Sequence, residues 1–149
     1  MNRFSYSTSR LTLGLMALLL FLAACDSDPA NEDEETLQGG ILATFNVEGE
    51  TFKVWTTNAQ TIEQILDLRH GKSLAAIPNG RLRAGAGHGA HNEPWSWHLD
   101  PEATAMAEST IEVCSGLPSF VEADLDEWVN NVGQYCPWSA SLVEVEDFR

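Results

Sequence analysis

The sequence predicts an α+β fold for residues 41–149: a mostly antiparallel sheet of about five to six strands with two helices on one face. This part of the chain has the length of a single domain. Two of its segments show helical spacing of apolar residues, and six others alternate like strands between Gly, Pro and Asn turns. The predicted order is two strands, a helix, three strands, a helix and a last strand, which is typical of α+β domains.

The first two strands are predicted to form a hairpin. Phe45 and Val47 alternate before a Glu48-Gly49 turn, and Phe52 and Val54 alternate after it.

A helix is predicted after this hairpin. Asn58 can cap its start, and Gly71 can take the left-handed conformation that ends it. Ile62, Ile65, Leu66 and Arg69 fall at helical spacing between them.

A second helix is predicted over residues 119–133. Ser119 and Glu122 have capping-box spacing, and Gly133 follows the last periodic residue. Its apolar face comprises Val121, Leu125, Trp128 and Val132. Four further segments are predicted strands, namely residues 80–87, 95–100, 109–116 and 136–148.

The N-terminus predicts export. Arg3 and Arg10 precede an apolar run, residues 11–23, of signal-peptide length. The run ends in "LAAC", which resembles the bacterial lipoprotein processing box. Residues 1–24 are therefore predicted to be a lipoprotein signal peptide, and Cys25 a lipidated first residue that anchors an exported bacterial lipoprotein on the periplasmic or cell-surface side of a membrane. The alternative is a soluble secreted protein, which is exported as well.

Residues 25–40 are predicted to be an acidic flexible tether. The sequence "DSDPANEDEETLQGG" is acidic, interrupted by Pro and Gly, and shows no apolar periodicity. A calcium site is the alternative, but the acidic residues lack the spacing of an EF-hand loop.

Cys114 and Cys136 are predicted to form a disulfide, because lipidation of Cys25 leaves this pair in an oxidising compartment. The competing interpretation is a cysteine nucleophile, for which no local family signature is present.

The charge limits the kinds of partner. The chain carries a net charge of −14, and residues 41–149 hold 6 basic and 16 acidic side chains, a net −10. Such a surface repels nucleic acid.

The segment "WSWHLD", residues 95–100, raises the question of a catalytic or metal site. As a strand it turns Trp95, Trp97 and Leu99 to one face, and Ser96, His98 and Asp100 to the other. The second set has the residue types of a hydrolase triad but not its arrangement, because side chains two apart in a strand stand side by side. A structural role for His98 and Asp100 is therefore expected.

The Gly-rich loop before this strand suggests a metal site. His88 and His91 have HxxH spacing and could bind zinc or copper together with His98 or Asp100.

Several segments resemble one known domain family. "FNVEGETFKV", "PWSWHLDPE", "TIEVCSGLPSFVEADLDEWVNNVG" and "YCPWSA" are similar to a small family named for the N-terminal domain of a calmodulin-binding protein. The resemblance covers nearly all of residues 45–145 and implies that residues 95–99, Cys114 and Cys136 belong to the framework. It implies no established activity, and calmodulin binding describes the whole protein that gave the name.

The sequence favours a lipid-anchored, non-catalytic binding module for an unknown protein or small ligand, without a cofactor. Its expected contact surface is the loop of residues 85–94 with Asn92, His98 and Asp100. The alternative is a metal-binding protein or metal-dependent enzyme that uses His88, His91 and His98.

Overall fold

The computed structural model describes residues 36–149. The predicted signal peptide, Cys25 and most of the tether lie outside these residues. Within residues 36–149, no helix is long and apolar enough to cross a membrane.

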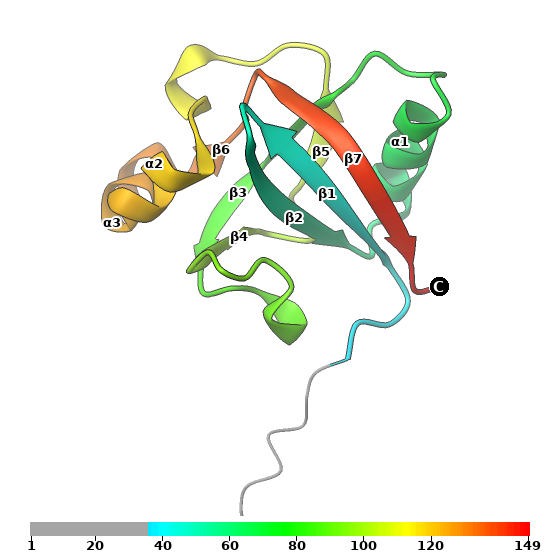
Figure 1. The fold of residues 1–149 in the computed structure, drawn as a ribbon, viewed down its shortest axis with the longest axis horizontal. Coiled ribbons are helices and arrows are strands. Elements are labelled where there is room, and N and C mark those ends of the chain that lie inside the picture. The colour runs from blue at the N-terminus through cyan, green and yellow to red at the C-terminus, as the bar shows by residue number, and fades with distance from the viewer. Residues whose placement is uncertain (1–35) are drawn as a thin grey trace, which may run out of the picture. The chain divides into compact units, whose positions relative to one another are not determined.

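The strands and helices alternate along the chain (Figure 1). The strands are β1 Ile41–Val47, β2 Glu50–Thr56, β3 Ile77–Ala84, β4 Trp97–Leu99, β5 Ala105–Ala107, β6 Gln134–Tyr135 and β7 Ala140–Asp147. The helices are α1 Ala59–Arg69, α2 Pro118–Ala123 and α3 Leu125–Glu127, with short 3-10 turns at His88–Ala90 and Glu112–Cys114 and a π-helical turn at Trp128–Val132.

The strands form two sheets rather than one. The first has the order β2-β1-β7. The second has the order β4-β3-β5, and β6 also pairs with β3. Every recorded pairing is antiparallel. The α+β class and the mostly antiparallel pairing are therefore confirmed, whereas the single sheet of five to six strands is replaced by seven strands in two sheets.

The predicted hairpin joins β1 and β2. Val47 pairs with Glu50, which leaves a two-residue turn of Glu48 and Gly49. Both turn residues have positive φ, 52° and 101°. Two-residue hairpin turns of this kind match the right-handed twist of the strands, and glycine adopts the second position without steric cost.

The predicted first helix is confirmed as α1. The side-chain oxygen of Asn58 accepts hydrogen bonds from the backbone N–H groups of Gln60 and Thr61, as an N-cap does. Ile62 and Ile65 are buried on the inner side of the helix.

The second predicted helix is wrong as a continuous element. Asp124 has φ −140° and ψ 52°, and this non-helical conformation separates α2 from α3. Ser119 lies inside α2 and does not cap it. Ser119 bonds to Glu50, and Glu122 bonds to Ser96. The capping-box residues are therefore used in tertiary contacts, while Gly133, at φ 73°, ends the helical region as predicted.

The strand predicted at residues 109–116 is also wrong. The strand in this region is β5, and its last residue, Ala107, pairs with Ile77 at the beginning of β3. The chain beyond Ala107 has therefore passed the end of its partner strand. Residues 112–114 form a 3-10 turn that places Cys114 in a buried position.

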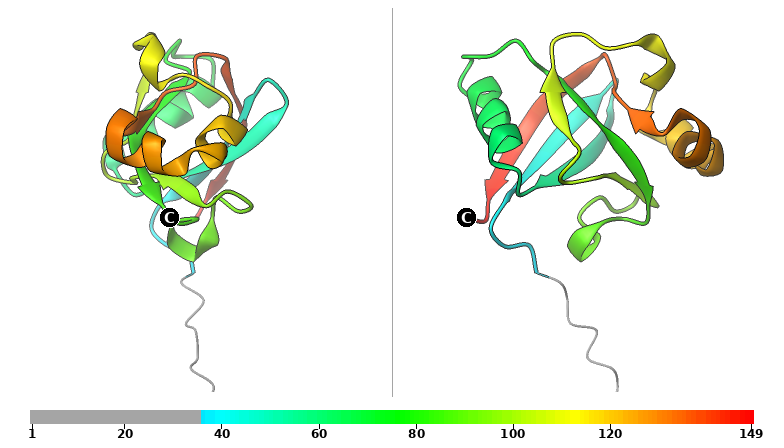
Figure 2. Two further views of the ribbon diagram at one scale, coloured as in Figure 1. Left: turned by 90° about the vertical axis from the view of Figure 1, so that its left-hand side faces the viewer. Right: turned by 180° about the vertical axis from the view of Figure 1, so that it is seen from behind.

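The core lies between the sheets and the helices. Its largest side chains include Phe45, Phe52, Trp97 and Tyr135, each at most 1% exposed. The helix α1 packs against β5 and β7, whereas α2 packs against β2. The two helical regions lie on opposite sides of the domain (Figure 2), so the prediction of two helices on one face is not confirmed.

Candidate functional site

The tryptophan face of β4 is part of the core. Trp97 and Leu99 are fully buried. The ring of Trp97 lies 5.2 Å from Tyr135 and 5.8 Å from Phe52, and Trp95 stacks on it at 6.2 Å. Aromatic contacts at these separations stabilise a core beyond simple burial. These rings therefore fill the core and form no ligand-binding surface.

The polar side chains of this segment bind three separate partners. The Ser96 hydroxyl donates to Glu122 at 2.7 Å, and His98 Nδ1 lies 2.7 Å from the carbonyl oxygen of Gly85. The Asp100 carboxylate accepts two hydrogen bonds from the Arg83 guanidinium, which lower the pKa of this carboxyl. The three groups hold neighbouring segments together and do not form a hydrolase triad.

Asn92 connects two strands from inside the protein. Its side-chain oxygen accepts a hydrogen bond from the backbone N–H of Lys53 at 2.6 Å, and its amide donates to the carbonyl oxygen of Trp97 at 2.7 Å. The residue is fully buried. Asn92 is therefore not available as part of the expected ligand surface, because both of its polar groups already link β2 to β4.

His91 is a neutral histidine held in the loop. It is 5% exposed, and its Nδ1 lies 3.0 Å from the carbonyl oxygen of His88. Burial lowers its pKa to about 4, with a smaller contribution from the nearby His98. Its Nε2 is buried without a hydrogen-bond partner. The rings of His91 and His98 meet edge to face at 5.9 Å.

The three histidines do not form a metal centre in the described structure. His88 stacks on Trp55, with ring centroids 6.2 Å apart. Within residues 36–149, no group of three or more His, Cys, Asp or Glu side chains could hold a metal ion.

The predicted disulfide is present between Cys114 and Cys136, with Cα atoms 5.2 Å apart. Both residues are buried. The alternative of a cysteine nucleophile is therefore wrong, because neither thiol is available.

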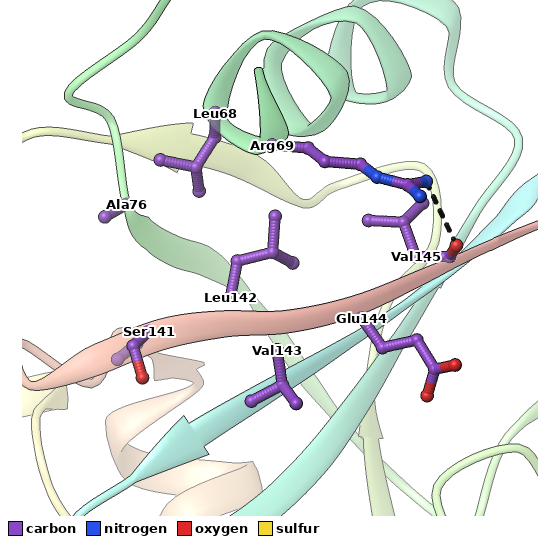
Figure 3. A pocket seen from close by; sticks show the side chains of 9 residues that line it. Leu68, Arg69, Ala76, Ser141, Leu142, Val143, Glu144 and Val145 are labelled. Carbon is purple, nitrogen blue, oxygen red and sulfur yellow. Dashed lines mark hydrogen bonds between the residues drawn. The ribbon is translucent and has the colours of Figure 1, made fainter. Parts of the chain in front are cut away.

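A groove between α1 and β7 is the site that sequence reasoning missed. Its volume is about 530 Å³, and it is lined by Leu68, Arg69, Ala76 and residues 140–145. Figure 3 shows Leu68 and Arg69 of α1 on one side and Leu142 of β7 on the other. The Arg69 guanidinium donates to the carbonyl oxygen of Val145 at 3.3 Å. The groove forms where the first helix meets the last strand, a contact that local spacing does not reveal.

The strand along this groove is at the edge of its sheet. Among the described strands, β7 pairs with β1 alone. The register shifts between Thr44 and Phe45 of β1, so that Val143 has no partner opposite it in the recorded pairing. Val143 is 61% exposed. An edge strand presents backbone N–H and C=O groups to which another extended chain can pair.

Comparison with known proteins identifies a domain family. The family model for the N-terminal domain of a calmodulin-binding protein matches residues 40–149. This is the family that the sequence segments resemble. No curated protein and no solved structure matches the chain.

Proposed function

We propose, given that this chain belongs to the family of the N-terminal domain of a calmodulin-binding protein, that it is a lipid-anchored, extracytoplasmic and non-catalytic binding module. Its ligand site is the groove between α1 and β7, and its ligand is a short polypeptide segment in extended conformation. The observation that carries the proposal is the groove itself, because an apolar floor lies there beside the exposed edge of β7.

The size and lining of the groove suit such a ligand. Its volume of about 530 Å³ lies within the usual range of ligand sites, roughly 300 to 1,000 Å³. Leu68 and Leu142 can contact apolar side chains. The edge of β7 can pair with the backbone of the ligand, which is the mode of recognition called β-strand addition.

Arg69 gives the groove a polar end. A guanidinium carries five N–H donors, and the recorded hydrogen bond to the carbonyl oxygen of Val145 orients the group. Its other donors are suited to a carbonyl or carboxylate oxygen of the ligand. A peptide that ends or turns beside Arg69 would therefore be favoured.

The anchor in this proposal is Cys25. The apolar run of residues 11–23 and the "LAAC" sequence support export and lipidation. Several acyl chains would hold the protein stably, since each buried CH₂ contributes about 0.8 kcal/mol. The acidic tether would then hold the domain off the membrane.

The groove is tested with the full chain in nanodiscs of zwitterionic lipid. Peptides are selected from a random library on the wild type and then measured on Val143→Arg, which changes the groove, and on Leu74→Arg. Leu74 is a matched control because it is 83% exposed and does not line the groove. We expect Val143→Arg to lose the selected peptides while Leu74→Arg retains them. Peptides that bind all three proteins equally would contradict the proposal.

The anchor is tested by mass spectrometry of the protein purified from bacterial membranes. We expect a lipid-modified N-terminus at Cys25, and a Cys25→Ala variant without the lipid mass. An unmodified mature N-terminus would contradict the anchor and leave the proposal for the groove intact.

The metal-binding function is the second candidate. The Nδ1 atoms of His91 and His98 each lie at hydrogen-bond distance from a backbone carbonyl oxygen. Donation to a carbonyl leaves the lone pair on Nε2, as in histidines that bind zinc or copper. Elemental analysis of the untagged protein and of a His88→Ala, His91→Ala variant tests this candidate. Stoichiometric metal that disappears in the variant would support it.

A further inference from the structure

Apolar side chains are exposed beside the disulfide. Ile111 is 64%, Val113 65% and Trp138 49% exposed. We call these three residues the disulfide platform. A hollow of about 290 Å³ opens next to them, lined by Trp138, Ile77 and residues 108–110. Exposed apolar patches of this kind on soluble domains mark sites of protein interaction.

The platform is held in one conformation by covalent and hydrogen bonds. The Trp138 indole N–H donates to the Thr110 hydroxyl at 2.7 Å, and the Trp138 backbone N–H donates to the Ser115 hydroxyl at 3.2 Å. The Cys136 backbone N–H donates to the carbonyl oxygen of Cys114 at 2.7 Å, beside the disulfide. A preformed surface loses little conformational entropy when a partner binds, which favours affinity.

The charge around the platform indicates a cationic partner. Residues 84–148 contain 12 Asp and Glu residues and no Lys or Arg. Two of these acids, Glu108 and Glu112, are exposed in the platform segment itself. A second copy of this chain would bring the same negative charge, and an anionic lipid surface would be repelled as well.

The platform lies at the end of the domain away from the chain entry. In Figure 1 the segment around residues 108–117, drawn in yellow, is at the opposite end from residues 36–40, drawn in cyan. If the N-terminus is held at a membrane, as the proposed function has it, this end faces outward.

We propose that the disulfide platform is a docking surface for a polypeptide segment that combines apolar side chains with Lys or Arg. Ile111, Val113 and Trp138 contact the apolar side chains, and Glu108 and Glu112 attract the cations. The orientation rests on the proposed function, but the surface is separate from the groove.

The test uses the full chain in zwitterionic nanodiscs and isothermal titration calorimetry. The probe is a capped peptide of alternating Leu and Lys, compared with the same peptide carrying Glu in place of Lys. We expect the Lys peptide to bind, with an affinity that falls as salt rises, and the Glu peptide not to bind. Ile111→Lys and Val113→Lys should each weaken binding by about tenfold or more, as losses at an interface centre do.

Two controls separate this proposal from its alternatives. Leu74→Lys adds the same charge at an exposed apolar residue elsewhere, and Val143→Arg alters the groove; both should bind the Lys peptide like the wild type. Equal binding of the two peptides, or equal loss in Leu74→Lys, would overturn the proposal. Loss in Val143→Arg alone would assign the peptide to the groove and overturn it too. Self-association of the wild type that Ile111→Lys abolishes would assign the platform to a second copy.

Discussion

His91 shows how one buried residue makes the stability of the loop depend on pH. Its pKa falls from the ordinary 6.5 to about 4, with burial as the largest cause. Between these values the unfolded chain binds a proton that the folded chain does not. The free energy of unfolding is therefore full above pH 6.5 and falls as the pH decreases toward 4, by about 3 kcal/mol when the group is taken alone. Denaturant unfolding measured from pH 7.5 to pH 4 tests this expectation.

The matched variant for this prediction is His91→Gln, which keeps a donor and does not titrate. Carboxylates also titrate at low pH, so the informative quantity is the difference in slope between the two proteins. His98, His88 and Lys53 are the other charged or titratable neighbours of the ring. Equal slopes in the wild type and the variant would show that His91 is already protonated in the folded state.

Gly87 is a second residue that fixes the loop. It has φ 83°, and a Cβ there would lie 2.2 Å from Cε1 of His91 and 3.0 Å from Cγ of His98. Gly85, at φ 90°, has no atom within 4 Å of such a Cβ. Gly85→Ala should cost about 1 to 2 kcal/mol for the left-handed conformation alone, and Gly87→Ala about 1 to 3 kcal/mol more for the clash. Chemical denaturation measures both, and equal losses would contradict the clash.

The sequence allows some of these roles to be predicted at the residue scale. His98 and Asp100 hold structure, as expected from their places in a strand. The role of Asn92 could not be predicted, because its partners, Lys53 and Trp97, lie on different strands. The role of His91 could not be predicted either, because burial depends on the path of the whole loop.

At the scale of elements, Glu50 connects the first hairpin to α2. Its carboxylate accepts hydrogen bonds from the backbone N–H of Ser119 at 2.8 Å and from the Ser119 hydroxyl at 2.7 Å. Glu50→Ala should therefore lower the free energy of unfolding by about 2 kcal/mol, since bonds to a charged group are among the stronger ones. Glu63→Ala, an exposed position on α1, is the control and should change stability little. A loss no larger than that of the control would contradict a structural role for Glu50.

The same contact explains why some elements are predictable and others are not. The hairpin and α1 are determined by nearby residues, namely the Glu48-Gly49 turn and the Asn58 cap. In the second helical region, Ser119 has the right spacing for a local cap but bonds to Glu50, 69 positions away. Tertiary bonds of this kind compete with local capping, so the break at Asp124 could not be read from spacing.

At the scale of the whole domain, the pairing of distant segments creates the groove. The last strand, β7, pairs with the first, β1, and its other edge meets α1. Alternation predicts that β7 is a strand, but it does not state which strand is its neighbour. The groove is therefore a property of the topology, and the platform depends on the disulfide in the same way.

Negative charge is the other property of the whole domain, and it predicts a response to salt. Residues 41–149 carry a net −10. The recorded ion pairs of the described residues, Lys72–Asp67, Arg83–Asp100 and Arg149–Asp147, leave most of the acidic side chains without a basic partner. Repulsion among them opposes the folded state, and salt screens it over a Debye length of about 8 Å at 0.15 M ionic strength.

We therefore expect Tm to rise by a few degrees, or about 1 kcal/mol, when sodium chloride is raised from roughly 0.01 M to 0.5 M. A variant with Glu144→Gln and Glu146→Gln should melt higher than the wild type at low salt and respond less to added salt, because two exposed charges on β7 are removed. Differential scanning calorimetry measures both effects. A Tm that falls with salt would mean that attraction within the ion pairs outweighs repulsion among the carboxylates, and the cationic partner proposed for the platform would lose its electrostatic basis.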